Sequence, residues 1–196
     1  MLKAKFLFVF NHENEPRNEK VTINMSDRYK LRSYLPLDKQ SVHQMIIEEF
    51  GHDYLDRSVW KFRKSKPIEK LGLIVSDTIH SHHEEIAASL QYWPIKIAEY
   101  KSLLLGPLVV RDHLKGKGIG SLLITSSVKM IKNSGWNFCL VSGEPYFFPK
   151  FGFKPVPENL LWPGSIDRQR LQYINLRNLC LEKVSNQPIT TLPDIY

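Results

Sequence analysis

The sequence predicts an α/β fold with a partly antiparallel sheet, and two observations carry this prediction. Apolar stretches of strand length alternate along the chain with amphipathic stretches of helix length. Near the middle, the apolar run at residues 103–110 leads through the glycine-rich turn Lys115–Ser121 into an amphipathic segment that begins at Ile119. Such a turn points several backbone N–H groups at one place, at the positive end of a helix. We therefore expect an anion-binding site at this turn.

The N-terminal half contains most of the expected strands. Apolar character predicts strands at residues 3–10, 21–25, 29–35, 71–75 and 86–97. A helix is expected after Pro36-Leu37-Asp38 and before Gly51, because apolar residues recur at helical spacing. These apolar positions are Val42, Met45, Ile46, Ile47 and Phe50. Residues 59–70 are basic and receive no assignment. Trp93-Pro94 interrupts the last strand, which predicts a bend or a sheet edge.

The C-terminal half contains the expected irregular strand. Pro107 lies inside the run 103–110 and cannot donate to a strand ladder, so we expect a bulge at Gly106-Pro107 that splays this strand from its neighbour. The helix from Ile119 places Leu122, Leu123, Met130 and Ile131 on one face. Gly135 stops it. Strands are predicted at residues 138–141 and 170–182, the latter as one long strand or a strand pair.

Composition limits the classes of protein to which the chain can belong. Its 196 residues, 42% of them hydrophobic, predict one domain, with an N-terminal elaboration at 1–28, a core at 29–184 and a tail at 185–196. The net charge of +7 favours anionic partners. Cys139 and Cys180 lie in apolar contexts, so we expect two buried free thiols in a reducing compartment. No stretch approaches the ~20 apolar residues of a membrane span, so we expect a cytoplasmic protein without a membrane partner.

The spacing of the glycines restricts which anion the turn binds. No Gly-Lys-Ser/Thr triplet occurs, so the turn is not a P-loop. Gly116 and Gly118 are followed by Ser121 where a dinucleotide fingerprint needs its third glycine. The pattern present is the basic residue Lys115 followed by glycines three and five residues later, at Gly118 and Gly120. It resembles the acetyl-CoA loop of the GNAT acyltransferases. The alternative is a glycine turn that merely ends a strand.

A second motif makes the resemblance more specific. Gly143-Glu144-Pro145-Tyr146-Phe147-Phe148-Pro149-Lys150-Phe151-Gly152-Phe153-Lys154-Pro155 is similar to a segment of the small bacterial YhbS-like branch of the GNAT N-acetyltransferases. The preceding Leu105-Gly106-Pro107-Leu108-Val109-Val110 resembles the branch's L-G-P-L-A-V strand. The resemblance extends over residues 29–182. It implies a GNAT fold, with a mixed, mostly antiparallel twisted sheet that is flanked by helices and has splayed central strands.

The same resemblance implies a coenzyme site. The expected cofactor-binding residues are Leu108, Val109, Val110, Lys115, Gly116, Lys117, Gly118, Ile119, Gly120, Ser121 and Phe148. Backbone N–H groups of the loop would hold the pyrophosphate. The bulged strand would pair with the amide groups of the pantetheine arm, and the N–H of Val109 or Val110 would polarise the acetyl carbonyl. Lys115 stands where the family has Gln or Arg, so it keeps a charge but loses the planar fork.

The acid and the base are less well defined by the sequence. GNAT enzymes commonly use a tyrosine four residues before the glycine of the G-F pair, and that position holds Phe148, with Phe147 beside it. A phenyl ring cannot donate a proton. Tyr146 is the nearest phenol and is one catalytic candidate, with a ring packed beside the coenzyme as its alternative. Glu144 is the other candidate, as a base or as a carboxylate that stabilises the turn.

We therefore expect an acetyl-CoA-dependent N-acetyltransferase that moves the acetyl group to a primary amine, of a small molecule or a protein, by direct attack. The alternative is a GNAT-fold protein that binds coenzyme A but catalyses weakly. Nucleic-acid binding by the basic run Lys61–Lys66 is a weaker hypothesis, and a homodimer is left open. The run His80–His83 has no second ligand group at defined spacing, so we expect no metal site.

Overall fold

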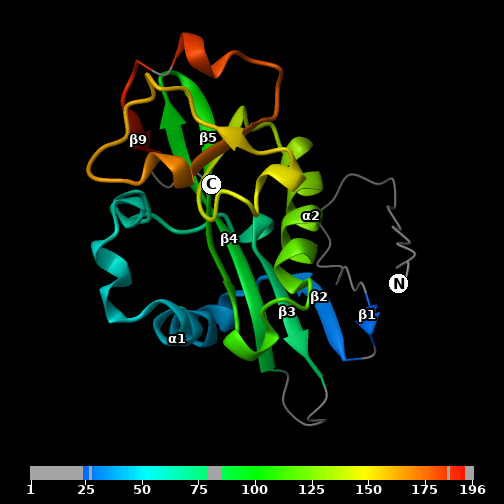
Figure 1. Cartoon of the computed structure of the whole chain (residues 1–196). Helices are drawn as coiled ribbons and strands as arrows, with labels where there is room; N and C mark the ends of the chain where they lie inside the picture. The colour runs from blue at the N-terminus through cyan, green and yellow to red at the C-terminus, as the bar shows by residue number, and fades with distance from the viewer. Residues whose placement is uncertain (1–23, 27, 79–84, 185, 193–196) are drawn as a thin grey trace.

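The computed structural model describes residues 24–26, 28–78, 85–184 and 186–192, and these form one nine-stranded mixed sheet with helices on both faces (Figure 1). The strands are β1 (Asn24–Ser26), β2 (Tyr29–Ser33), β3 (Leu73–Asp77), β4 (Glu85–Ile97), β5 (Tyr100–Val110), β6 (Phe138–Ser142), β7 (Lys154–Pro155), β8 (Leu171–Asn175) and β9 (Ile189–Thr191). Their order is β1-β2-β3-β4-β5-β6-β8-β7, with β9 on β4. Every pair is antiparallel except β5 and β6. The predicted fold class is confirmed.

The two α-helices of the described residues cover opposite faces of the sheet (Figure 1). α1 (Lys39–Phe50) packs with Ile74 of β3, whereas α2 (Ile119–Lys132) packs with the adjacent Val75. Neighbouring strand residues point to opposite faces, so the two helices lie on different sides. Short 3-10 helices fill the connections: η1 (Pro36–Asp38), η2 (His52–Asp56), η3 (Ser58–Phe62), η4 (Glu69–Leu71), η5 (Asp112–Leu114), η6 (Pro149–Phe151), η7 (Arg168–Arg170) and η8 (Leu181–Lys183). Both predicted helices are confirmed.

The centre of the sheet opens along one side of β5. Leu90 of β4 pairs with Leu108 while Tyr92 pairs with Leu105, so Gly106 and Pro107 together oppose one residue of β4. This is the predicted bulge. The parallel partner β6 pairs with β5 only over 102–105. Among the described residues, β5 therefore has a strand partner on one side only from Gly106 to Val110, and the predicted splay of the central strands is confirmed.

Three parts of the sequence prediction need correction. Of the two alternatives predicted at Trp93-Pro94, a bend or a sheet edge, the edge is wrong, since β4 is central and Pro94 falls between the residues that pair with β3 and those that pair with β9. The strand expected through residue 182 stops at Asn175, whose side-chain oxygen accepts the N–H groups of Arg177 and Leu179 and starts a turn. The expected tail contributes β9, in which Ile189 is buried. The strand predicted at 3–10 lies outside the described residues.

The two cysteines are expected to differ in reactivity. Cys139 is fully buried in β6, and burial raises the pKa of its thiol, which leaves little reactive thiolate. Cys180 is exposed in the loop after β8, so the prediction that both thiols are buried is wrong for this one. We expect Ellman's reagent to modify Cys180 in the native protein and Cys139 only in denaturant. Two rapidly reacting thiols per native chain would contradict this assignment.

Candidate active site

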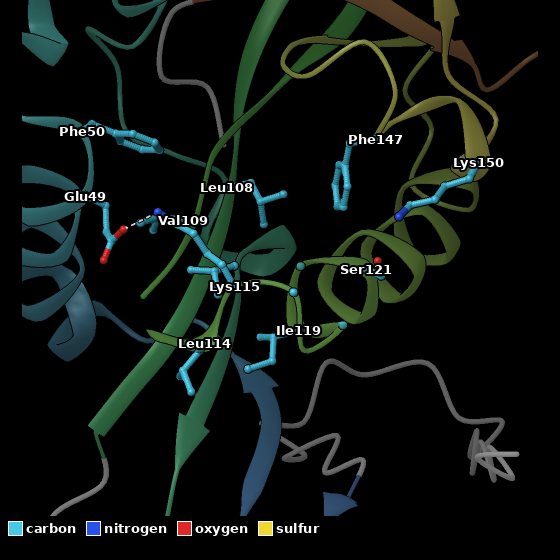
Figure 2. Close-up of a pocket in the computed structure, with 14 residues that line it drawn as sticks. Glu49, Phe50, Leu108, Val109, Leu114, Lys115, Ile119, Ser121, Phe147 and Lys150 are labelled. Atoms are coloured by element: carbon cyan, nitrogen blue, oxygen red, sulfur yellow. Dashed lines mark ion pairs between the residues drawn. The ribbon is translucent and has the colours of Figure 1, made fainter. Parts of the chain in front are cut away.

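A cavity of about 440 Å³ lies beside the part of β5 that no longer pairs with β6 (Figure 2). Figure 2 shows α1 on one side of it, β5 behind it, and the start of α2 on the other side. The residues that line it are Glu49, Phe50, Leu108, Val109, Val110, Leu114, Lys115, Gly116, Gly118, Ile119, Gly120, Ser121, Phe147 and Lys150. The splayed strand, the glycine turn and the start of a helix, which lie in sequence order, thus share one cavity.

The free edge of β5 presents backbone hydrogen-bonding groups to this cavity. The N–H of Arg111 donates to the carbonyl of Ala87 on β4. Backbone groups of an antiparallel strand alternate in direction, so the N–H of Val109 also faces β4, while those of Leu108 and Val110 face the open edge. Of the two residues expected to polarise a carbonyl, Val109 is therefore excluded by its direction. Leu108 and Val110 have the required orientation.

The glycine turn provides the second set of free N–H groups. The first helical bond of α2 runs from the N–H of Leu122 to the carbonyl of Gly118, so the N–H groups of Ile119, Gly120 and Ser121 have no acceptor within the helix. Gly118 has a φ of 84°, a conformation that L-residues with side chains adopt at a cost. A Cβ there would meet no atom within 4 Å, so the turn faces open space. An anion would find both free donors and the positive end of the helix dipole here.

Lys115 is held by carboxylates. Its Nζ lies 2.8 Å from Glu49 Oε2 and 2.9 Å from Asp112 Oδ1. The hydrogen bond to Glu49, followed by that to Asp112, raises the pKa of this ammonium. The other oxygen of Glu49 accepts the N–H of Asp112 at 2.8 Å. Glu49 therefore ties the end of α1 to the start of the turn, and the charge of Lys115 is already partly neutralised.

Lys117 and Phe148 were expected among the cofactor-binding residues, but neither lines the cavity. Lys117 is exposed, and its N–H bonds to the carbonyl of Leu114 instead of facing the cavity. Phe148 is buried in the main core, where its ring packs closely over Gly143 and edge-on against Phe153. A Cβ at Gly143 would lie 2.1 Å from that ring, so the glycine is required by the close approach. Phe147 lines the cavity in place of Phe148 (Figure 2).

The two catalytic candidates also lie away from the cavity lining. The N–H of Phe147 bonds to the carbonyl of Glu144, so Pro145 and Tyr146 form the tip of a tight turn. Tyr146 is consequently 95% exposed and points to solvent. The carboxylate of Glu144 accepts a hydrogen bond of 2.5 Å from Arg170, as expected of a carboxylate that stabilises the turn. Neither side chain is placed to act on a molecule in the cavity.

The sequence did not predict Glu49, Phe50, Leu114, Phe147 or Lys150 as lining residues. Phe147 and Lys150 belong to the second motif, and the amine of Lys150 lies 4.4 Å from the centre of the Phe147 ring. Their position in that motif was a usable signal. Glu49 and Phe50 come from a helix some sixty residues before the turn. Only the packing of α1 against β5 brings them there, so no local pattern could identify them.

Two negative findings apply to the described part of the chain. No group of three His, Cys, Asp or Glu side chains could hold a metal ion there, and the run His80–His83 lies outside it. Nor does any helix of this part combine the length and apolar character that a bilayer crossing requires.

Comparison with known proteins identifies the architecture. No protein-family model matches the chain, and no curated protein matches it in sequence. Its structure does match YhbS of Escherichia coli in complex with CoA, with a TM-score of 0.66, 18% identity, and coverage of 92% of this chain and 94% of that one. The chain has the GNAT fold. The predicted resemblance is confirmed at this level.

Two other solved structures with the GNAT fold support the same conclusion. A GNAT family acetyltransferase from Brucella melitensis, in complex with acetyl-CoA, matches with a TM-score of 0.60 and 16% identity over 84% of this chain and 96% of that one. One from Staphylococcus aureus matches with a TM-score of 0.52 and 15% identity over 76% of this chain and 99% of that one. These low identities mean that the architecture is shared while most side chains differ.

Proposed function

We propose that this chain binds acetyl-CoA and transfers its acetyl group to an amine by direct attack in a ternary complex. One observation carries the proposal: a single cavity joins the free N–H groups at the start of α2 to the free edge of β5. Acetyl-CoA carries a pyrophosphate and an arm with two amide groups, so these two sets of backbone groups match it. The GNAT fold, with relatives crystallised with CoA or acetyl-CoA, supports the same ligand.

We assign roles to the N–H groups of Leu108 and Val110, which face the open edge of β5, from their order along the strand. The glycine turn follows Val110, so an arm that starts at the turn and runs along the strand edge meets Val110 first and Leu108 last. We assign Val110 to an arm amide, as in the addition of a strand. The backbone N–H of Leu108 then donates to the carbonyl oxygen of the thioester, where negative charge develops when the amine attacks. One such donor is typically worth about 3–4 kcal/mol in the transition state.

Proton transfer has no dedicated side chain among the described residues that line the cavity. An amine of the lysine type has a pKa of about 10.4 and must lose a proton before it attacks, while the departing thiolate gains one. The ionisable lining residues are Glu49, Lys115 and Lys150, and the first two pair with each other. We propose that water carries these protons. The same observation favours the second candidate function, a GNAT-fold protein that binds coenzyme A with little catalysis.

Two measurements together test the proposal. Thiol release from acetyl-CoA is followed with a panel of primary amines, and the affinity for coenzyme A is measured separately by calorimetry. Amine-dependent thiol release above background, with an acetylated product of the expected mass, would support the transferase. Tight binding without release for any amine would instead favour the binding protein. Absence of binding would contradict both.

Lys150 is expected to contribute to coenzyme affinity through its charge. Its ammonium lies at the cavity rim over the Phe147 ring, on the side of the start of α2 (Figure 2). We expect Lys150→Met to weaken coenzyme A binding by about 3–10-fold at low salt, and by less at high salt because exposed charges are screened. Lys132→Met makes the same change of charge at the other end of α2 and should leave the affinity unchanged. Equal effects of the two variants would contradict a local role for Lys150.

A further inference from the structure

Arg63 carries a positive charge without a carboxylate partner among the described residues. Its guanidinium carbon lies 4.2 Å from the centre of the Trp60 ring, which holds the group by a cation–π contact. Its Nε is shut off from solvent and has no hydrogen-bond partner in the described chain. Burial lowers the pKa of this guanidinium, so an anion that paired with it would recover part of the cost of burying the charge.

The bulge in β5 makes room for this guanidinium. Gly106 has a φ of 121°, in the region that favours glycine. A Cβ at this position would lie 2.7 Å from the Nη2 of Arg63. The charged group thus lies directly against the backbone of the bulge. Leu108, two residues further along the same strand, already lines the cavity and is assigned above to the thioester carbonyl.

Arg63 lies on the α1 face of the sheet, because Trp60 packs with the residues of α1. Other buried donors without partners lie on this face. Ser89 pairs with Val109, whose side chain packs on the α1 face, and Trp93 follows Ser89 by four residues, so both point to that face. The Oγ of Ser89 and the Nε1 of Trp93 are buried and have no hydrogen-bond partner among the described residues. The Oγ of Ser65, two residues after Arg63, is likewise buried without a hydrogen-bond partner among the described residues. Each of these groups can donate a hydrogen bond, so the surroundings of Arg63 contain donors and no described carboxylate.

We propose that the acetyl acceptor is a small amine that also carries a carboxylate, and that Arg63 binds this carboxylate. The proposal rests on the proposed acetyltransferase function and adds the class of acceptor. The guanidinium fork matches a carboxylate with two parallel hydrogen bonds. Because of the bulge, the stretch of β5 from Leu105 to Leu108 spans only two residues of β4, or roughly 7 Å, so Gly106 lies closer to Leu108 than that. The amine and the carboxylate must therefore lie close together, as in an amino acid or a short ω-amino acid.

The test measures binding without turnover. Calorimetry compares amino acids and short ω-amino acids with their uncharged amides, on the protein alone and on its complex with coenzyme A. We expect some acid in this panel to bind at least about 30-fold more tightly than its amide. Arg63→Gln should reduce this ratio to near one, and Arg63→Lys should keep a preference about tenfold weaker than that of the native protein, since the charge remains without the fork. Lys64→Gln removes a neighbouring exposed charge and should leave the ratio unchanged.

Each outcome decides between the proposals. Equal affinities for every acid and its amide, or a preference that survives Arg63→Gln, would overturn the assignment of Arg63. If Arg63→Gln does not fold, a preference weakened about tenfold or more in a folded Arg63→Lys upholds the role of the guanidinium, and an unweakened preference overturns it. Failure to bind coenzyme A would contradict the proposed function alone, because acid-selective binding on the free protein that depends on Arg63 would still uphold the carboxylate site.

Discussion

Gly118→Glu is expected to lower the affinity for coenzyme A by about 100-fold or more, an effect of roughly 3 kcal/mol. Gly118 immediately precedes α2, and nothing lies within 4 Å of the place where its Cβ would be. The new side chain would therefore enter the space in front of the free N–H groups of Ile119, Gly120 and Ser121. Its carboxylate would bind the positive end of the helix in place of the phosphates, and would repel them as well.

A matched control separates this effect from backbone strain. Gly135 follows the other end of α2, and its φ of 84° equals that of Gly118. A non-glycine residue in this conformation costs about 1–2 kcal/mol at either position. Gly135→Glu should therefore destabilise the fold by a similar amount in thermal unfolding while calorimetry finds coenzyme binding intact. An unchanged affinity in a folded Gly118→Glu variant would show that the anion binds elsewhere.

The parts of the fold that follow from local rules could be predicted from the sequence. Pro107 lacks an N–H and cannot continue a regular central strand, and the bulge forms at Gly106-Pro107 as expected. The helix after the glycine turn follows from the spacing of its apolar residues. Both rules act over a few residues. This explains why the cavity could be located beside β5 and the turn without knowledge of the whole sheet.

What depends on contacts between distant segments could not be predicted. Lys115 was expected among the cofactor-binding residues and lines the cavity, but its ion pair with Glu49, from a helix far away in the sequence, could not be predicted. The direction of Tyr146 depends on the turn closed by the Glu144 carbonyl and the Phe147 N–H, which a count of residues along the motif does not reveal. Ile189 was assigned to a tail because three residues are too few to identify a strand that β4 stabilises. Tertiary packing decided between local alternatives for Lys115 and Ile189, whereas a local turn set the direction of Tyr146.

Leu108→Pro is expected to lower kcat for acetyl transfer by about 10²–10³-fold while the fold is kept. The substitution removes one N–H, and that N–H faces the open edge of β5 and not the ladder with β4. Proline is tolerated where a strand edge has no partner. If this N–H donates to the thioester carbonyl, its loss removes about 3–4 kcal/mol of transition-state stabilisation. The rate of thiol release at saturating acetyl-CoA, with the best amine of the panel, measures kcat.

Two companion variants show whether the missing N–H is the cause. Leu108→Ala shortens the same side chain but keeps the N–H, so kcat should fall far less than in Leu108→Pro. Val109→Pro removes an N–H that faces β4, so it should lower the free energy of unfolding because a ladder bond is lost. A Leu108→Pro variant with native kcat would contradict the assignment of Leu108. Among residues 108–110, Val110 is the other one whose N–H faces the open edge, so the carbonyl would then lie beside the glycine turn, with the arm running in the opposite direction along β5.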